Sequence, residues 1–104
     1  MSHPVTMLVS YYPKEGQEQA FFEIMQRHWP TLDELGLVTS DKPRIFRATD
    51  KDSGRQYFIE IFSWKDEGAS DLAHQSPEVM AVWEPMGPLL ERMQLSRVEE
   101  IAEV

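Results

Sequence analysis

The 104-residue chain contains no cysteine. This absence excludes a disulfide framework, a thiolate metal site and a thiol nucleophile. It also suits a reducing cytoplasm, where we expect the protein to reside. Asparagine is absent as well.

Basic residues are few, with 10 Lys and Arg against 18 Asp and Glu, which gives a net charge of −8. A nucleic-acid surface needs clustered Lys and Arg to displace counterions, and no such cluster occurs here. Long apolar runs are missing too, since a membrane helix requires about 20 such residues. Residues 1–4 lack the basic patch and apolar run of a signal peptide. We therefore expect neither a nucleic-acid partner nor a membrane partner.

The composition is that of an ordinary globular protein, with 41% hydrophobic and 27% charged residues. Chains divide into several domains only well above this length. We expect one domain spanning residues 1–104.

Changes in hydrophobic periodicity predict the elements of the first half. Residues 4–12 are rich in β-branched and aromatic side chains, which predicts a strand. Residues 15–29 carry an apolar stripe at steps of three and four, which predicts a helix with one buried face. Pro30 should break or kink this helix, and residues 32–36 should form a short extra turn closed by glycine. Members of the stripe are Phe21, Ile24, Met25, His28 and Leu32.

The second half predicts a hairpin, a helix and a last strand. Residues 44–50 and 56–64 are strand-like and flank a polar turn that contains Gly54. Residues 66–75 are weakly helical, and Ser76 followed by Pro77 is a clear helix start. Two prolines should bend or split this helix near Gly87. Residues 95–104 should form the last strand. The order is that of an α+β fold, the ferredoxin-like split βαβ (βαββαβ) with an antiparallel sheet.

Both faces of the predicted strand 56–64 are largely apolar, although helices should cover only one face of the sheet. Phe58, Phe62 and Trp64 alternate with Tyr57 and its neighbours. Large exposed apolar patches are uncommon on monomers. We therefore expect the free face to pack against a second copy, which would make a homodimeric α/β barrel. The alternative is an exposed patch.

Two short motifs flank the predicted junction between strand and helix. The strand ends in Phe62-Ser63-Trp64-Lys65-Asp66, and the next helix opens at His74-Gln75-Ser76-Pro77-Glu78-Val79. With the order of elements, these motifs resemble the antibiotic biosynthesis monooxygenase (ABM) family over residues 5–98. The resemblance implies a dimeric α/β barrel. The family includes cofactor-free quinone-forming monooxygenases, haem-degrading enzymes and processors of signalling molecules.

The residues depart from two branches of that family. The haem-degrading branch has an Asn on the first strand and a Trp ahead of a haem-ligating His, whereas this chain has no Asn and His74 precedes Trp83. We therefore expect no haem and no other cofactor. The quinone-forming branch places an Asn four residues before the Trp that matches Trp64. That position is Glu60, which replaces a neutral donor with a potential base.

Glu60 is the main candidate for a catalytic residue. Phe58 and Phe62 flank it on the same strand face, so burial could make it a general base. The alternative is a structural ion pair with Arg44 or Arg47 on the adjacent strand.

The other candidates surround the same face. Trp64, Trp83 and Met86 could wall a pocket for a small aromatic ligand, although packing in the core or at its rim is the more common reason for such residues. His74 could carry protons, or it could be an ordinary hydrogen-bonded residue at a helix junction. His28 lies on an apolar stripe, where a satisfied core histidine is expected.

No metal site is expected. The three histidines show no His-x-His or His-Glu-x-x-His pair. Residues 50–54 imitate the start of a calcium loop, but the glycine comes one place early and strands flank the segment.

Two functions remain open. The first is a cofactor-independent monooxygenase acting on a small aromatic or quinone-type metabolite, with Glu60 as base. The second is a non-catalytic dimeric barrel that binds a metabolite or serves as an interaction module. An open cleft that reaches Glu60 would favour the first, and a sealed core around Trp83 would favour the second.

Overall fold

A computed structural model of the chain describes residues 3–102. It contains four strands, four α-helices and one short 3-10 helix. In chain order these are β1 (Val5–Pro13), α1 (Glu18–Met25), α2 (His28–Glu34), β2 (Arg44–Thr49), β3 (Gln56–Trp64), α3 (Ala69–His74), α4 (Pro77–Met86), η1 (Gly87–Leu89) and β4 (Leu90–Arg97).

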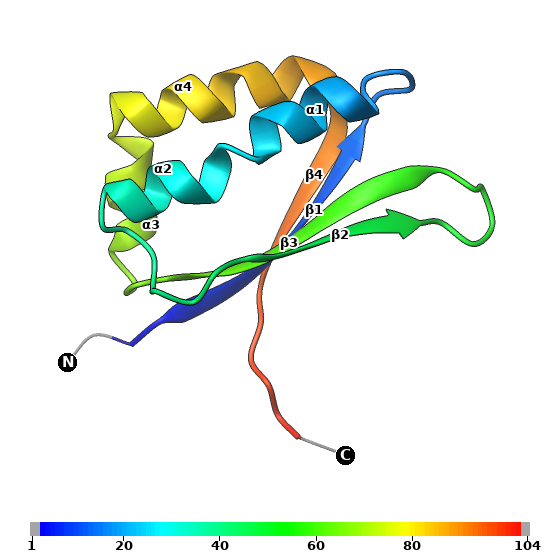
Figure 1. The fold of residues 1–104 in the computed structure, drawn as a ribbon. Coiled ribbons are helices and arrows are strands. Elements are labelled where there is room, and N and C mark those ends of the chain that lie inside the picture. Colours follow the sequence, from blue (N-terminus) through cyan, green and yellow to red (C-terminus); the bar gives the residue numbers. More distant parts are fainter. Residues whose placement is uncertain (1–2, 103–104) are drawn as a thin grey trace.

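The strands form one antiparallel sheet in the order β2-β3-β1-β4. All four α-helices lie on the same side of this sheet, and the far end of the β2–β3 hairpin projects beyond them (Figure 1). The architecture is the α+β ferredoxin-like fold that the order of elements predicts. The sheet does not close on itself.

Local chemistry explains the hairpin between β2 and β3. The Asp50 carboxylate accepts hydrogen bonds from the backbone N–H groups of Asp52 and Ser53, at 2.9 and 2.8 Å. Gly54 has φ +75°, a conformation that glycine adopts without steric cost. The segment is therefore a turn, as predicted.

The start of α4 also follows the prediction. The Ser76 hydroxyl accepts a hydrogen bond from the Val79 N–H at 3.3 Å, and Pro77 occupies the first helical position. The helix ends at Met86, and the chain continues as η1 through Pro88. The proline-rich segment therefore splits the helix near Gly87.

Two element boundaries differ from the predictions. The first helical segment breaks before His28, not at Pro30. Pro30 lies in the first turn of α2, where backbone N–H groups have no partner within the helix, so proline is tolerated there. The last strand spans Leu90–Arg97, whereas residues 98–102 are not in a strand. Residues 103–104 of the predicted strand lie outside the described part of the chain.

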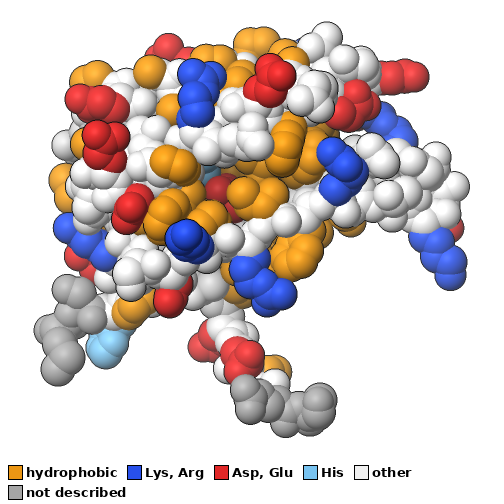
Figure 2. Space-filling model, viewed as in Figure 1, with side chains coloured by type: hydrophobic (Ala, Val, Ile, Leu, Met, Phe, Trp, Pro, Cys, Tyr) orange, Lys and Arg blue, Asp and Glu red, His pale blue; other side chains and the backbone are white. Residues whose placement is uncertain are grey.

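The core lies between the sheet and the helices. Figure 2 shows hydrophobic side chains gathered between these layers, and Asp and Glu side chains spread over the helical layer. Phe21 of α1, Leu32 of α2 and Val79 of α4 pack with Phe58 of β3 in this core. Only two polar residues are buried among residues 3–102, namely His28 and Glu60.

The face of the sheet away from the helices carries an apolar patch on β2 and β3. Tyr57, Ile59 and Ile61 of β3 point to this side and are half-buried. Phe46 of β2 pairs in register with Ile59 and is 41% exposed. We call this side the open face. No helix among residues 3–102 is long and apolar enough to span a membrane.

Candidate active site

Glu60 projects from β3 into the core and contacts a histidine from the helical layer. Its side chain is fully buried, and His28 at the start of α2 is 4% exposed. The His28 Nδ1 atom lies 2.9 Å from Glu60 Oε1 and 3.1 Å from Oε2. These residues are 32 positions apart in the sequence and meet because α2 packs over β3.

Tyr11 of β1 supplies a second donor to the same carboxylate. Its hydroxyl donates a hydrogen bond to Glu60 Oε1 at 2.7 Å. Burial, followed by the negative charge of Glu60 and then by this hydrogen bond, raises the pKa of Tyr11 well above its ordinary value of 10.0. Tyr11 therefore remains a neutral donor over the physiological range of pH.

The contacts of Glu60 determine the tautomer of His28. A carboxylate can only accept hydrogen bonds, so the proton of a neutral His28 ring belongs on Nδ1. The Nε2 atom then carries a lone pair. It is buried and has no hydrogen-bond partner among residues 3–102. Buried polar atoms are rarely left unpaired, so this atom is a candidate for contact with a ligand.

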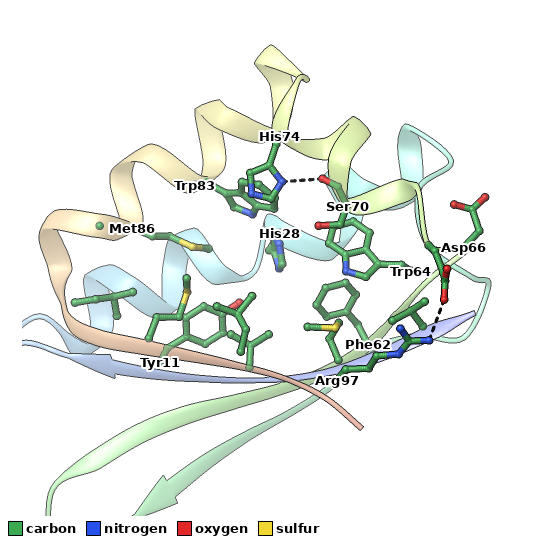
Figure 3. A pocket seen from close by; sticks show the side chains of 18 residues that line it. Tyr11, His28, Phe62, Trp64, Asp66, Ser70, His74, Trp83, Met86 and Arg97 are labelled. Carbon is green, nitrogen blue, oxygen red and sulfur yellow. Dashed lines mark hydrogen bonds and ion pairs between the residues drawn. The ribbon is translucent and has the colours of Figure 1, made fainter. Parts of the chain in front are cut away.

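A cavity of about 400 Å³ lies between the sheet and the helices and contains this histidine in its wall. Its other walls come from β1, β3, β4, α3, α4, η1 and the segment that follows β3, and Figure 3 shows the side chains that line it. The walls are mainly apolar and aromatic. The volume and lining are typical of a site for a small organic molecule. Two of its lining residues on β4, Met93 and Leu95, are 47% and 57% exposed.

Charged residues surround one part of the cavity. Asp66 and Glu67 follow the end of β3, and Arg97 lies at the end of β4. Arg97 and Glu67 form an ion pair at 3.2 Å in which both side chains are mostly exposed. Exposed ion pairs of this kind add little stability. The relevance of this pair lies in the charges that it places near the cavity.

Four of the five predicted site residues line this cavity, namely Trp64, Trp83, Met86 and His74. The fifth, Glu60, does not, because His28 lies between it and the cavity. His74 is exposed, its Nδ1 donates to the Ser70 carbonyl at 2.7 Å, and its ring packs edge-on against Trp83 with centroids 4.8 Å apart.

The predicted arginine partners of Glu60 do not contact it. Arg44 lies over the ring of Phe46, and Arg47 lies over the ring of Phe58. The interpretation of Glu60 as half of an arginine ion pair is therefore wrong, because the carboxylate is hydrogen-bonded to His28 and Tyr11 instead.

Sequence reasoning missed two residues of the site. His28 was expected to be a satisfied core histidine, but only one of its ring nitrogens has a partner. Tyr11 was treated only as part of a strand. Their positions in the sequence could have indicated this role, because both residues lie in apolar segments, and these segments pack against the buried Glu60.

No group of three or more His, Asp or Glu side chains that could hold a metal ion occurs in the described range 3–102. The site therefore consists of an apolar cavity lined by His28 and Tyr11, both of which hydrogen-bond to the carboxylate of Glu60 outside the lining.

Solved structures share this fold over nearly the whole chain. A crystal structure of an antibiotic biosynthesis monooxygenase has a TM-score of 0.72 at 12% sequence identity, with 94% of this chain and 99% of that chain covered. SnoaB, a cofactor-independent oxygenase from Streptomyces nogalater, has a TM-score of 0.67 at 16% identity, with coverages of 93% and 94%. PA3566 from Pseudomonas aeruginosa has a TM-score of 0.71 at 14% identity, with 98% of each chain covered.

These similarities confirm the predicted resemblance to ABM proteins at the level of the fold. No family model matches the chain, and no curated protein matches it. At such low identities the shared fold does not by itself assign a reaction.

Proposed function

We propose that the protein is a cofactor-independent monooxygenase that oxidises a small hydroxylated aromatic compound to a quinone. The observation that supports this most directly is the His28–Glu60 pair, because the His28 ring lines an apolar cavity and its Nε2 atom is buried without a partner among residues 3–102. The fold shared with SnoaB, whose structure is described as that of a cofactor-independent oxygenase, is consistent with this reaction.

In the first step, His28 Nε2 takes the proton of an aromatic hydroxyl group. Glu60 holds the other ring nitrogen and stabilises the imidazolium that forms, which is the usual role of a carboxylate behind a catalytic histidine. Glu60 is thus a positioning residue in this proposal. It acts on the substrate through His28.

Molecular oxygen is the oxidant. The electron-rich phenolate adds O₂ at a ring carbon that carries hydrogen, and the imidazolium protonates the resulting peroxide. His28 then takes the proton from that carbon, the C–H electron pair becomes the second C=O bond, and the O–O bond breaks. The departing hydroxide takes the proton from His28 and leaves as water. One O₂ is consumed, and one quinone and one water are formed.

The remaining cavity residues would bind and orient the substrate. We propose that Trp64, Trp83 and Met86 hold the flat ring, because aromatic and thioether surfaces suit such a ligand. His74 is exposed and also lines the cavity. We propose that it exchanges protons between the cavity and the solvent.

We also propose that two copies pack through their open faces to form a homodimeric barrel, which would act in the cytoplasm. The half-buried Tyr57, Ile59 and Ile61 and the exposed Phe46 provide the apolar surface for this contact.

Oxygen uptake and quinone formation with a dihydroxynaphthalene, without added flavin or metal, test the proposed reaction. Glu60→Gln should lower turnover by about 10²- to 10⁴-fold, because it removes the carboxylate while keeping its shape. Glu23→Gln makes the same change at an exposed position on α1 and is the matched control.

Full turnover in Glu60→Gln would contradict the assigned role of the pair. A wild-type protein that binds hydroxyarenes but consumes no oxygen would support the alternative of a non-catalytic binding protein.

A further inference from the structure

Negatively charged side chains outnumber positively charged ones around the cavity. Three carboxylates lie close to it, with Asp66 and Glu67 in its lining and Glu60 directly behind His28. Arg97 is the only Lys or Arg side chain in its lining, and it is already paired with Glu67. Tyr11, which lines the cavity, donates a hydrogen bond to the Glu60 carboxylate at 2.7 Å, and burial followed by the charge of Glu60 raises the pKa of this tyrosine.

Most polar groups of the inner wall already have hydrogen-bond partners within the protein. The Tyr11 hydroxyl is committed to Glu60, and His28 Nδ1 is committed to the same carboxylate. His28 Nε2 is the buried polar side-chain atom of the lining that has no partner among residues 3–102. When the ring is neutral and its proton is on Nδ1, this atom carries a lone pair and accepts a hydrogen bond from a ligand O–H or N–H.

We propose that this cavity selects uncharged aromatic ligands that place one hydrogen-bond donor on His28 Nε2, and that it excludes ligands that arrive as anions. The inference rests on the proposed function for the identity of the cavity as the substrate site. It adds two ligand properties that determine binding, namely the net charge of the ligand and its hydrogen-bond donor.

The physical basis is the cost of unpaired and like-charged groups. An aromatic ether of the same size would leave Nε2 buried without a partner. A carboxylate would lose its hydration in a cavity already faced by negative charge, and it has no proton to give to Nε2. The proposed phenolate differs from such a ligand, because it forms inside the cavity while its proton remains on His28.

Isothermal titration with three naphthalenes near neutral pH tests the inference through binding alone. They are 2-naphthol, 2-methoxynaphthalene and 2-naphthoate, which share the ring system and differ in one substituent. We expect 2-naphthol to bind about 10-fold more tightly than the ether and at least about 100-fold more tightly than the carboxylate.

Two variants localise the preference. His28→Phe keeps an aromatic ring but removes Nε2, so the preference for 2-naphthol over the ether should disappear. His74→Phe makes the same change elsewhere in the cavity lining and should keep it. Asp66→Asn combined with Glu67→Gln should improve binding of 2-naphthoate several-fold while 2-naphthol binding stays within about twofold.

Similar affinities of the wild-type protein for 2-naphthol and its ether would overturn the inference, as would tight binding of 2-naphthoate. Failure of all three ligands to bind would overturn it too, as would a preference that depends on His74 in place of His28. The titrations measure binding alone, so their result is separate from that of the oxygen-uptake assay. If the ligand preference is found but no oxygen is consumed, only the proposed reaction is refuted. If oxygen is consumed but the ligand preference is absent, only this inference is refuted.

Discussion

The two faces of strand β3 carry similarly apolar side chains but have different environments. Phe58, Phe62 and Trp64 are buried beneath the helices, whereas Ile59 and Ile61 on the open face are only half-buried. The buried polar pair is on the helical face. On the open face, aromatic stacking and exposed groups dominate, as in the stacked rings of Tyr12 and Tyr57, 4.8 Å apart.

The difference shows that apolar alternation alone does not identify the functional face of a sheet. A charged residue within an apolar row is more informative, because it must find partners inside the protein. Glu60 finds them in His28 and Tyr11. The cavity opens beside this network.

The largest expected effect on stability comes from truncating a buried side chain on the helical face of β3. Phe58→Ala should reduce the free energy of unfolding by about 3–5 kcal/mol, because it removes a ring packed against Phe21 and Phe22. Chemical denaturation measures this loss.

Phe46→Ala on the open face is the matched comparison for Phe58→Ala. It should cost about 1 kcal/mol or less in the isolated chain, because the ring is already 41% exposed. A cost that grows with protein concentration would show that a second copy covers this face. Equal costs for the two variants at low concentration would contradict the distinction between the faces.

The next effect concerns assembly. Ile61→Lys should weaken the proposed dimer by at least about 100-fold, or about 3 kcal/mol, because it places a charge in the apolar contact. Analytical ultracentrifugation at micromolar concentrations measures this change. Leu72→Lys, at an exposed position on α3, should leave the assembly unchanged. A wild-type protein that stays monomeric at high concentration would refute the barrel.

A smaller effect should follow from removing one hydroxyl behind the site. Tyr11→Phe should cost about 1–3 kcal/mol in unfolding free energy, because Glu60 loses a buried donor. Tyr57→Phe on the open face should cost less. Thermal unfolding of both variants compares the same chemical change on the two faces.

The pH dependence of stability gives a second measure of Tyr11. Its pKa is higher in the folded state than the ordinary value of 10.0. The corresponding stability is fully present below that value and is lost as the pH rises above it through the folded-state pKa. Tyr11→Phe should therefore reduce the loss of stability in alkali. An unchanged alkaline profile would contradict this role.

The smallest effect is expected at the hairpin turn, which belongs to neither face. Backbone N–H groups of Ser53 and Asp52 lower the pKa of Asp50. Its contribution to stability is therefore present above the ordinary value of 3.8 and is lost as the pH falls through the folded-state pKa. Asp50→Asn should lower the melting temperature only slightly near neutrality and not at all in strong acid. A large effect would mean that the turn supports more than its own backbone.

Much of the fold was predictable because its signals are local. The hairpin turn and the Ser76 cap each depend on a few adjacent residues. The start of the last strand was mispredicted because Leu90 and Met93 continue the helical spacing of α4. Only the pairing with β1 reveals that these residues belong to a strand.

The site was less predictable because its key contact is long-range. Nothing in the sequence states which turn of the first helical segment lies over Glu60, and the break before His28 changes that alignment. An arginine on the neighbouring strand was a reasonable expected partner. Those arginines instead lie over the rings of Phe46 and Phe58. The roles assigned to Glu60, His74, Trp64, Trp83 and Met86 stay predictions until the variants are measured.

The position of β4 has a consequence for how a ligand enters. Within residues 3–102 this strand lies at the edge of the sheet and pairs with β1 alone, while its residues Met93 and Leu95 line the cavity. Edge elements open locally at lower free energy than the centre of a fold. We therefore expect β4 to open locally more readily than β1 and β3, which carry Tyr11 and Glu60, and such opening would widen the cavity on that side. Backbone amides of β4 should exchange with deuterium sooner than those of β3, and a bound ligand should slow their exchange first.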